Sequence, residues 1–139
     1  MSTGTCVCGA VAFEVRPPYR FFQYCHCSRC RKRSGSIHAA NLAVPAEQFV
    51  WLRGEDQVKT FELPSARSWS NGFCERCGSS MPWRTRNGRT VVVPAGALDD
   101  DPIERPARNV WMASRADWEV AASSLPGFDQ EPPPPPRQG

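Results

Sequence analysis

The chain has 139 residues, enough for one domain and too few for two well-packed ones. Hydrophobic residues make up 40% of it and the net charge is only +3, which is ordinary for a globular domain and argues against a nucleic-acid partner. No apolar run approaches the roughly 20 residues that span a bilayer, and the first residues lack the pattern of a signal peptide. We therefore expect a cytoplasmic protein with no membrane partner and with reduced thiols. The oligomeric state is left open.

The predicted elements are short strands, because β-branched and aromatic residues recur between turn signals and fourteen prolines disfavour long helices. Asn87-Gly88 is a strong hairpin signal. Two short helices are expected, of about two turns over 28–34 and about one turn over 46–49, and residues 99–102 are expected to form a turn or a helix start. In chain order, the expected strands are 11–15, 37–44, 58–63, 67–73, 80–84, 90–93 and 110–112. The prediction is a mainly β domain of short twisted strands.

The last residues differ in composition from the rest of the chain. Pro132 to Pro136 stand in a row, which is typical of an extended polyproline segment or of disorder. A bare proline run is only a weak signal for a binding partner. We therefore expect one folded domain over residues 1–128 and a Pro-rich, disordered tail over residues 129–139.

Seven cysteines carry the strongest chemical signal, and their odd number cannot pair fully into disulfides. Cys-x-Cys and Cys-x-x-Cys spacings place thiols close enough to share one metal. Two of the three clusters have glycine directly after the second cysteine, where it permits a sharp turn. Two such cysteine knuckles make a closed four-thiolate site, a usual form of structural zinc. The predicted ligands are Cys6, Cys8, Cys74 and Cys77.

The remaining cluster, Cys25-His26-Cys27-Ser28-Arg29-Cys30, places three thiols in one loop. Three protein ligands and an open position are the pattern of a reactive zinc. The basic residues Arg29, Arg31 and Lys32 would favour an anionic ligand there. We therefore predict that Cys25, Cys27 and Cys30 hold a second zinc, which makes two Zn²⁺ per chain.

Other assignments of these ligands stay open. His26 or His38 could complete the second site, although His26 lies between two ligands and is expected to point away from their metal. The cysteines could also divide differently, for instance Cys6 and Cys8 with Cys25 and Cys27. Thiolate clusters can hold iron–sulfur centres as well, but short knuckles followed by glycine fit zinc better.

The order of the three motifs resembles the glutathione-dependent formaldehyde-activating enzyme (GFA) family, which also includes centromere protein V. The motifs are Cys-x-Cys-Gly-Ala-Val from Cys6, Cys-His-Cys-Ser-x-Cys-Arg-Lys from Cys25, and Phe-Cys-x-x-Cys-Gly-Ser from Phe73. The similarity continues through 94–100 and 113–119 and extends over about 4–128. It implies a β-tent fold, the same division of the cysteines into four and three, and a more labile second zinc.

The resemblance also implies a carbon–sulfur lyase activity, in which the thiolate of glutathione attacks formaldehyde to give S-hydroxymethylglutathione. Glutathione or a related thiol would be the partner, Arg29 an anion contact, and no side chain is assigned as a general acid or base. The family pattern often places histidine just before the late strand, where this chain has Asn109, which we interpret as structural. The competing hypotheses are a non-enzymatic thiol or zinc carrier or docking module, and nucleic-acid association.

Overall fold

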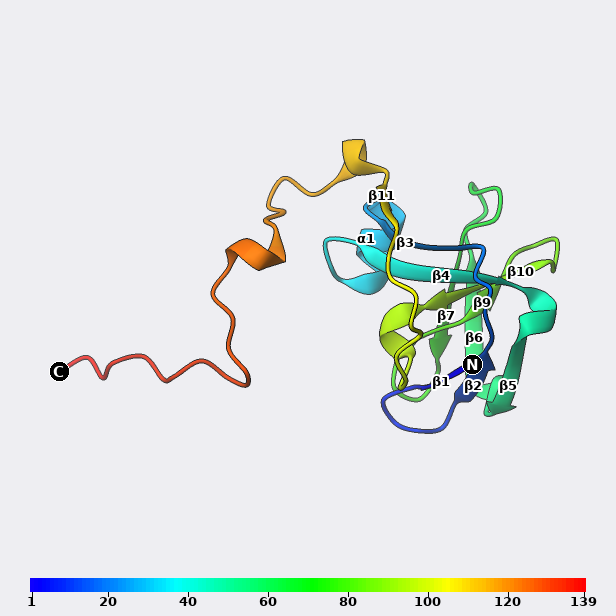
Figure 1. The fold of residues 1–139 in the computed structure, drawn as a ribbon, viewed down its shortest axis with the longest axis horizontal. Helices are drawn as coiled ribbons and strands as arrows, with labels where there is room; N and C mark the ends of the chain where they lie inside the picture. Colours follow the sequence, from blue (N-terminus) through cyan, green and yellow to red (C-terminus); the bar gives the residue numbers. More distant parts are fainter.

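The computed structural model describes residues 1–139 and contains eleven short strands, one α-helix and five single-turn 3₁₀-helices (Figure 1). No strand exceeds seven residues, and all strand pairings but one are antiparallel. The prediction of a mainly β fold of short antiparallel strands is confirmed. No helix is long and apolar enough to cross a membrane.

The strands form three sheets. The first has the order β1-β2-β5, the second β11-β3-β4-β10-β9 and the third β6-β7-β8. In the second sheet, β11 pairs with β3 in parallel. The strand bounds are β1 Ser2–Thr5, β2 Ala12–Val15, β3 Phe21–Cys25, β4 Ala39–Pro45, β5 Phe49–Arg53, β6 Val58–Glu62, β7 Ser70–Cys74, β8 Ser80–Met81, β9 Trp83–Arg84, β10 Thr90–Pro94 and β11 Arg108–Val110.

The helical elements are short, as the proline content predicts. The α-helix α1 spans Ser28–Ser34, as predicted, and ends where Gly35 takes a left-handed backbone and its N–H donates to the carbonyl of Arg31. The 3₁₀-helices are η1 Ala46–Gln48, η2 Glu55–Gln57, η3 Ala95–Ala97, η4 Met112–Ser114 and η5 Ala122–Ser124.

The core lies where the three sheets meet. Its fully buried side chains include Phe13 from the first sheet, Leu42 and Val93 from the second, and Met81 from the third. Cys6 and Cys74 belong to the same buried cluster. Two of the four cysteines predicted to form one metal site therefore pack into the core.

Several sequence predictions differ from the structure. Strands β1, β3 and β5 were not predicted, because their residues lack a clear alternation of apolar and polar positions. The late strand is Arg108–Val110 and not 110–112, since Trp111 takes a left-handed backbone with φ 59° and η4 follows it. Residues 99–102 form bends and no helix, and the carboxylates of Asp99 and Asp100 accept hydrogen bonds from β1.

The chain beyond η5 contains no helix or strand. Residues 125–139 are exposed, and in Figure 1 this segment runs away from the folded body. The division at residue 128 and the disorder of the tail both stay predictions.

Candidate metal centres

The structure brings together the two cysteine knuckles, Cys6–Cys8 and Cys74–Cys77. All four Sγ atoms lie within 4.8 Å of one another. The Sγ of Cys8 lies 3.5 Å from that of Cys6 and 3.9 Å from that of Cys74. Ligands at about 2.3 Å from a tetrahedral zinc stand about 3.8 Å apart. The donor set and its spacing therefore fit a closed four-thiolate metal site.

The two knuckles of this group share one backbone geometry. Gly9 and Gly78 take left-handed φ angles of 77° and 78°. The N–H of Gly9 donates to the carbonyl of Cys6 at 2.9 Å, and that of Gly78 donates to the carbonyl of Cys74 at 2.8 Å. Glycine reaches this conformation without steric cost, so each turn folds its two thiols toward the same point.

Polar groups favour the thiolate form of two of the four cysteines, Cys6 and Cys77, whose pKa values are lowered. The backbone N–H of Val11 donates to Cys6 Sγ at 3.3 Å. The hydroxyl of Ser79 lies 3.2 Å from Cys77 Sγ, and this contact, with the Ser79 backbone, lowers the pKa of Cys77 to about 6. Thiolates are the form that binds metal, so these contacts prepare the group for a cation.

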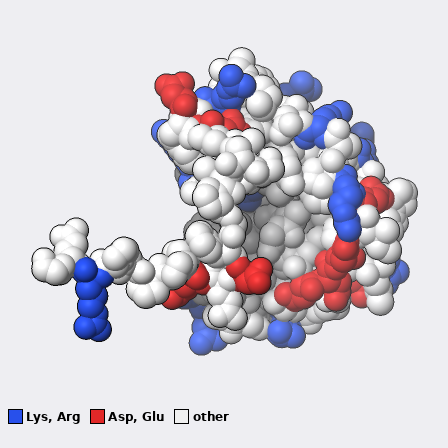
Figure 2. Space-filling view, turned by 60° about the vertical axis from the view of Figure 1, so that its left-hand side comes forward, with Lys and Arg blue, Asp and Glu red and all other residues white.

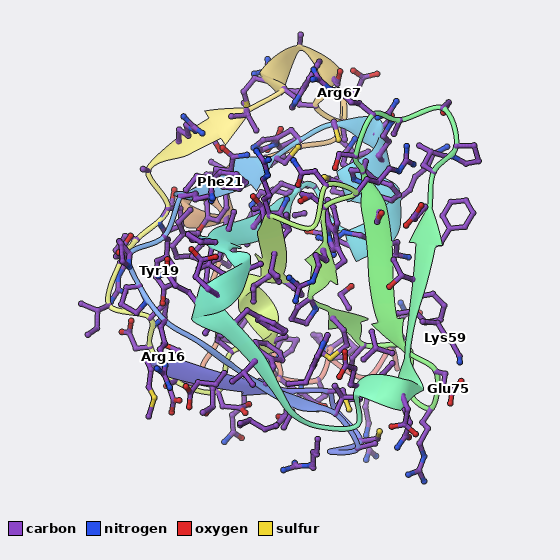
Figure 3. The ribbon with its side chains drawn as sticks, turned by 90° about the vertical axis from the view of Figure 1, so that its right-hand side faces the viewer. Arg16, Tyr19, Phe21, Lys59, Arg67 and Glu75 are labelled. Carbon is purple, nitrogen blue, oxygen red and sulfur yellow. The ribbon has the colours of Figure 1, made fainter.

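The third sheet holds the second knuckle in place from outside. Lys59 Nζ on β6 lies 3.4 Å from Glu75 Oε2, a residue inside the Cys74–Cys77 turn, and both are labelled in Figure 3. The backbone N–H of Glu75 also donates to the carbonyl of Gln57 at 2.9 Å. The turn is therefore anchored to η2 and β6 as well as to β7.

The second group, which we call the cysteine trio, consists of Cys25, Cys27 and Cys30. Cys25 ends β3, Cys27 is the N-cap of α1, and Cys30 lies in the first turn of that helix. Their Sγ atoms lie within 4.8 Å of one another, and Cys25 and Cys30 are buried. The N–H of Cys30 donates to Cys27 Sγ at 3.4 Å. The helix start thus gathers three thiols at one point.

The thiols of the trio have unequal acidity because they compete for protons. The contact with Cys30 and burial raise the pKa of Cys25. The contact with Cys25 lowers the pKa of Cys30 to about 5, against the effect of burial and with help from the Trp69 indole. Cys30 is therefore a stronger acid than Cys25 within the trio.

Neither histidine joins the trio. The ring of His26 is buried, with Nε2 at 2.9 Å from Asn109 Oδ1 and Nδ1 at 3.0 Å from Glu119 Oε1. His38 stacks on Tyr24, with the ring centroids 4.1 Å apart. His26 points away from the cysteines, as expected for a residue between two ligands. Asn109 is its partner, in agreement with the structural interpretation of that position.

The structure also decides between the two divisions of the cysteines. The pairs Cys6–Cys8 and Cys25–Cys27 fall in different groups, so the alternative that joins them is wrong. Two separate thiol groups, one of four and one of three, can each hold a metal ion. That the ion is zinc stays a prediction.

A cavity of about 380 Å³ adjoins the trio. Four of its twelve lining residues are aromatic, and Arg29 is the one cation among them. The aromatic residues are Phe21, Trp69, Trp83 and Trp111. Arg31 and Lys32 do not line it. The sequence analysis named Arg29 as an anion contact but assigned no role to the three tryptophans. They are far apart in the chain, so no sequence motif connects them.

The face of the molecule drawn in Figure 2 shows no extended basic patch. On the side shown in Figure 2, Lys and Arg side chains are scattered and alternate with acidic ones. A nucleic-acid footprint would gather cations along one stripe or face. The view thus offers no support for the nucleic-acid hypothesis.

Comparison with known proteins agrees with this geometry. The sequence model of the family described as glutathione-dependent formaldehyde-activating enzyme matches residues 1–114. The chain belongs to this family. A Halomonas elongata protein named "Putative glutathione-dependent formaldehyde-activating enzyme" is 31% identical over 122 residues, covering 83% of this chain and 77% of that protein.

A solved structure supports the fold of this family member. A Rhodobacter sphaeroides protein superposes with a TM-score of 0.58 at 24% identity, covering 77% of this chain and 98% of the other. At this identity the likeness concerns the fold alone. The family match ends at residue 114, directly after the region that contains both thiol groups and the aromatic cavity.

Proposed function

We propose that this chain is a zinc-dependent carbon–sulfur lyase that acts on the adduct of glutathione, or of a related thiol, with formaldehyde. The observation that carries the proposal is the cysteine trio, which has three sulfur donors, no fourth protein donor and a cavity beside it. Three ligands and an open position distinguish reactive from structural zinc sites. The printed name of the Halomonas elongata relative supports the same reaction.

In this proposal the two thiol groups have different roles. Cys6, Cys8, Cys74 and Cys77 would hold a structural zinc that ties the start of the chain to β7, and Cys25, Cys27 and Cys30 would hold the second zinc. All seven cysteines are free thiols in the structure. Since such thiols persist in a reducing compartment, the proposal includes a cytoplasmic location.

The residues around the trio would bind and orient the substrate. Zinc held by the trio would supply Lewis acidity and lower the pKa of a thiol at the open position. Arg29 would attract a carboxylate of the tripeptide, and the tryptophans of the cavity would exclude water from the reacting sulfur. Formaldehyde hydrate and a thiol form the hemithioacetal adduct with release of one water, so a site that excludes water would favour the adduct.

Metal content is the first test of this function. Elemental analysis of protein purified without chelator is expected to give two zincs per chain, and one after substitution Cys30→Ser. Iron, or no metal, in the wild-type protein would contradict the proposal. Lys32→Gln is the matched control, because Lys32 is exposed on the same helix.

Catalysis is the second test, because the adduct also forms spontaneously. Exchange NMR of glutathione and formaldehyde is expected to show faster interconversion with the wild-type protein than without it. Cys30→Ser should return the rate to the spontaneous value. Equal rates with and without the loaded wild-type protein would remove the enzymatic function.

One observation favours the binding alternative. The cavity beside the trio has no His, Asp or Glu in its lining, so no side chain there can act as an ordinary general acid or base. A thiol or zinc carrier would need none. Calorimetry with glutathione separates the two functions, since binding without any acceleration of adduct exchange identifies a carrier.

A further inference from the structure

Arg33, in the last turn of α1, is half-buried, and its guanidinium has few hydrogen-bond partners. Its Nη2 donates to Asn41 Oδ1 on β4 at 3.0 Å, while its Nη1 is buried without any hydrogen-bond partner. None of the five ion pairs of the protein includes it. A buried cation without a carboxylate is costly, so its charge must be balanced by another anion.

The carboxylate that shares a cavity with Arg33 is already engaged. Asp99 lines the same cavity of about 570 Å³ as Arg33. Its Oδ2 accepts a hydrogen bond from the Thr5 hydroxyl at 3.0 Å, and it lies beyond ion-pair distance of Arg33. The cavity also contains His38, which supplies no negative charge.

The geometry places the thiols of the trio near Arg33, because Asn41, which accepts the bond from Arg33 Nη2, lines the same cavity as the three cysteines. Burial lowers the pKa of Arg33, and the charges of Cys30, Cys25 and Cys27, in that order, oppose this shift. Cys30 and Arg33 are three residues apart on α1, so they share one face of the helix. Exposed Lys32 does not share that face.

We propose that Arg33 is the charge-balancing residue of the cysteine trio, which lets the three thiolates and an anionic fourth ligand coexist around one metal ion. This inference rests on the proposed function of the trio as a metal site. Three thiolates around a divalent cation leave one net negative charge, and a bound thiolate leaves two. A buried guanidinium offsets one of them.

The position of Arg33 suits this role and not substrate contact. Arg33 does not line the aromatic cavity beside the trio, whereas Arg29 does. It therefore acts as a positioning residue, which alters the charge of the site without occupying the space of the ligand. Its bond to Asn41, which lines that cavity, fixes the guanidinium against β4.

The test compares Arg33→Gln, Arg33→Lys and Lys32→Gln in the full chain loaded with Co²⁺. Two quantities are measured: the rate at which each bound ion passes to a chromophoric chelator, and the change of the thiolate–cobalt absorption on titration with 2-mercaptoethanol. Lys32→Gln removes the same charge from the exposed side of α1 and controls for net charge.

Arg33→Gln is expected to release the trio's ion about 10-fold or more faster and to weaken 2-mercaptoethanol binding similarly, as is usual when a residue supporting the ligands is lost. The ion of the four-cysteine group should leave at the wild-type rate. Arg33→Lys should recover part of both effects, since it restores the charge but not the fork of donors. Lys32→Gln should match wild type.

Other outcomes overturn the inference in distinguishable ways. Unchanged release and unchanged thiol binding in Arg33→Gln would remove the role of Arg33 and leave the metal function intact. Equal acceleration at both groups, with no recovery in Arg33→Lys, would show that Arg33 only stabilises the fold. A wild-type chain with a single bound ion would overturn the metal function of the trio, and the role of Arg33 with it.

Discussion

At the scale of single residues, two glycines determine how the four-cysteine group forms. A Cβ added to Gly9 or Gly78 would meet no atom within 4 Å, so space is not the constraint. The constraint is the backbone, because φ angles of 77° and 78° are unfavourable for any residue with a side chain. Each turn that brings two thiols together therefore needs glycine, which has no Cβ, at this position.

Gly78→Ala is expected to destabilise the zinc-loaded protein by about 1–2 kcal/mol through left-handed strain. Urea unfolding of the loaded protein measures this cost. Gly96→Ala is the matched control, because Gly96 has equal free space but no left-handed backbone, and it should be neutral. An unchanged unfolding midpoint for Gly78→Ala would contradict the role assigned to the turn.

At the scale of elements, a buried polar contact attaches the segment after η4 to the loop of the trio. Glu119 Oε1 lies 3.0 Å from His26 Nδ1, and His26 is held on its other side by Asn109, next to the end of β11. The N–H of His26 also donates to the carbonyl of Val110 at 3.0 Å. The loop that carries two ligands of the trio is thus held by chain nearly a hundred residues away in sequence.

Glu119→Ala is expected to destabilise the protein by about 1–3 kcal/mol, because it leaves a buried imidazole nitrogen without its partner. Hydrogen exchange should rise in the segment around residues 115–120 and in the loop of the trio. Asp117→Ala, an exposed neighbour, controls for the loss of a negative charge. Equal exchange in the two variants would show that the contact does not hold the segment.

At the scale of the whole molecule, the four-cysteine group joins elements distant in sequence. Cys6 and Cys74 lie in the same buried cluster as side chains from all three sheets. The trio sits at one end of the second sheet, in a smaller cluster with Ala39. Loss of metal from the two groups should therefore have very different consequences for the fold.

Cys74→Ser is expected to abolish folding or lower stability severely, because a structural zinc contributes on the order of 10 kcal/mol. Cys30→Ser should keep the fold and lose one metal. Circular dichroism melts together with elemental analysis check both. Equal stability of the two variants would contradict the division into a structural and a reactive site.

Deletion of residues 129–139 is expected to leave the melting temperature unchanged. All of these residues are exposed, and none takes part in a helix, a strand or an ion pair. The melt of the truncated chain measures this directly. A fall of several degrees would show that the tail packs against the domain.

The sequence by itself determined the two groups of cysteines and the local turns. The cysteine spacing and the glycines after two of the pairs predict turns that depend only on neighbouring residues, as does the span of α1. The structure contains the same cysteine groups and the same helix. The late strand was predicted at 110–112 but lies at Arg108–Val110, because no local pattern indicates that Trp111 takes a left-handed backbone.

Tertiary structure alone decided which residues surround the trio. Trp69, Trp83 and Trp111 meet in one cavity only because β7, β9 and the end of β11 come together in the fold. The bond of His26 to Asn109, its close approach to Glu119 and the bond of Arg33 to Asn41 on β4 likewise join residues from different elements. Burial and pairing depend on the packing of whole sheets, which no local pattern encodes.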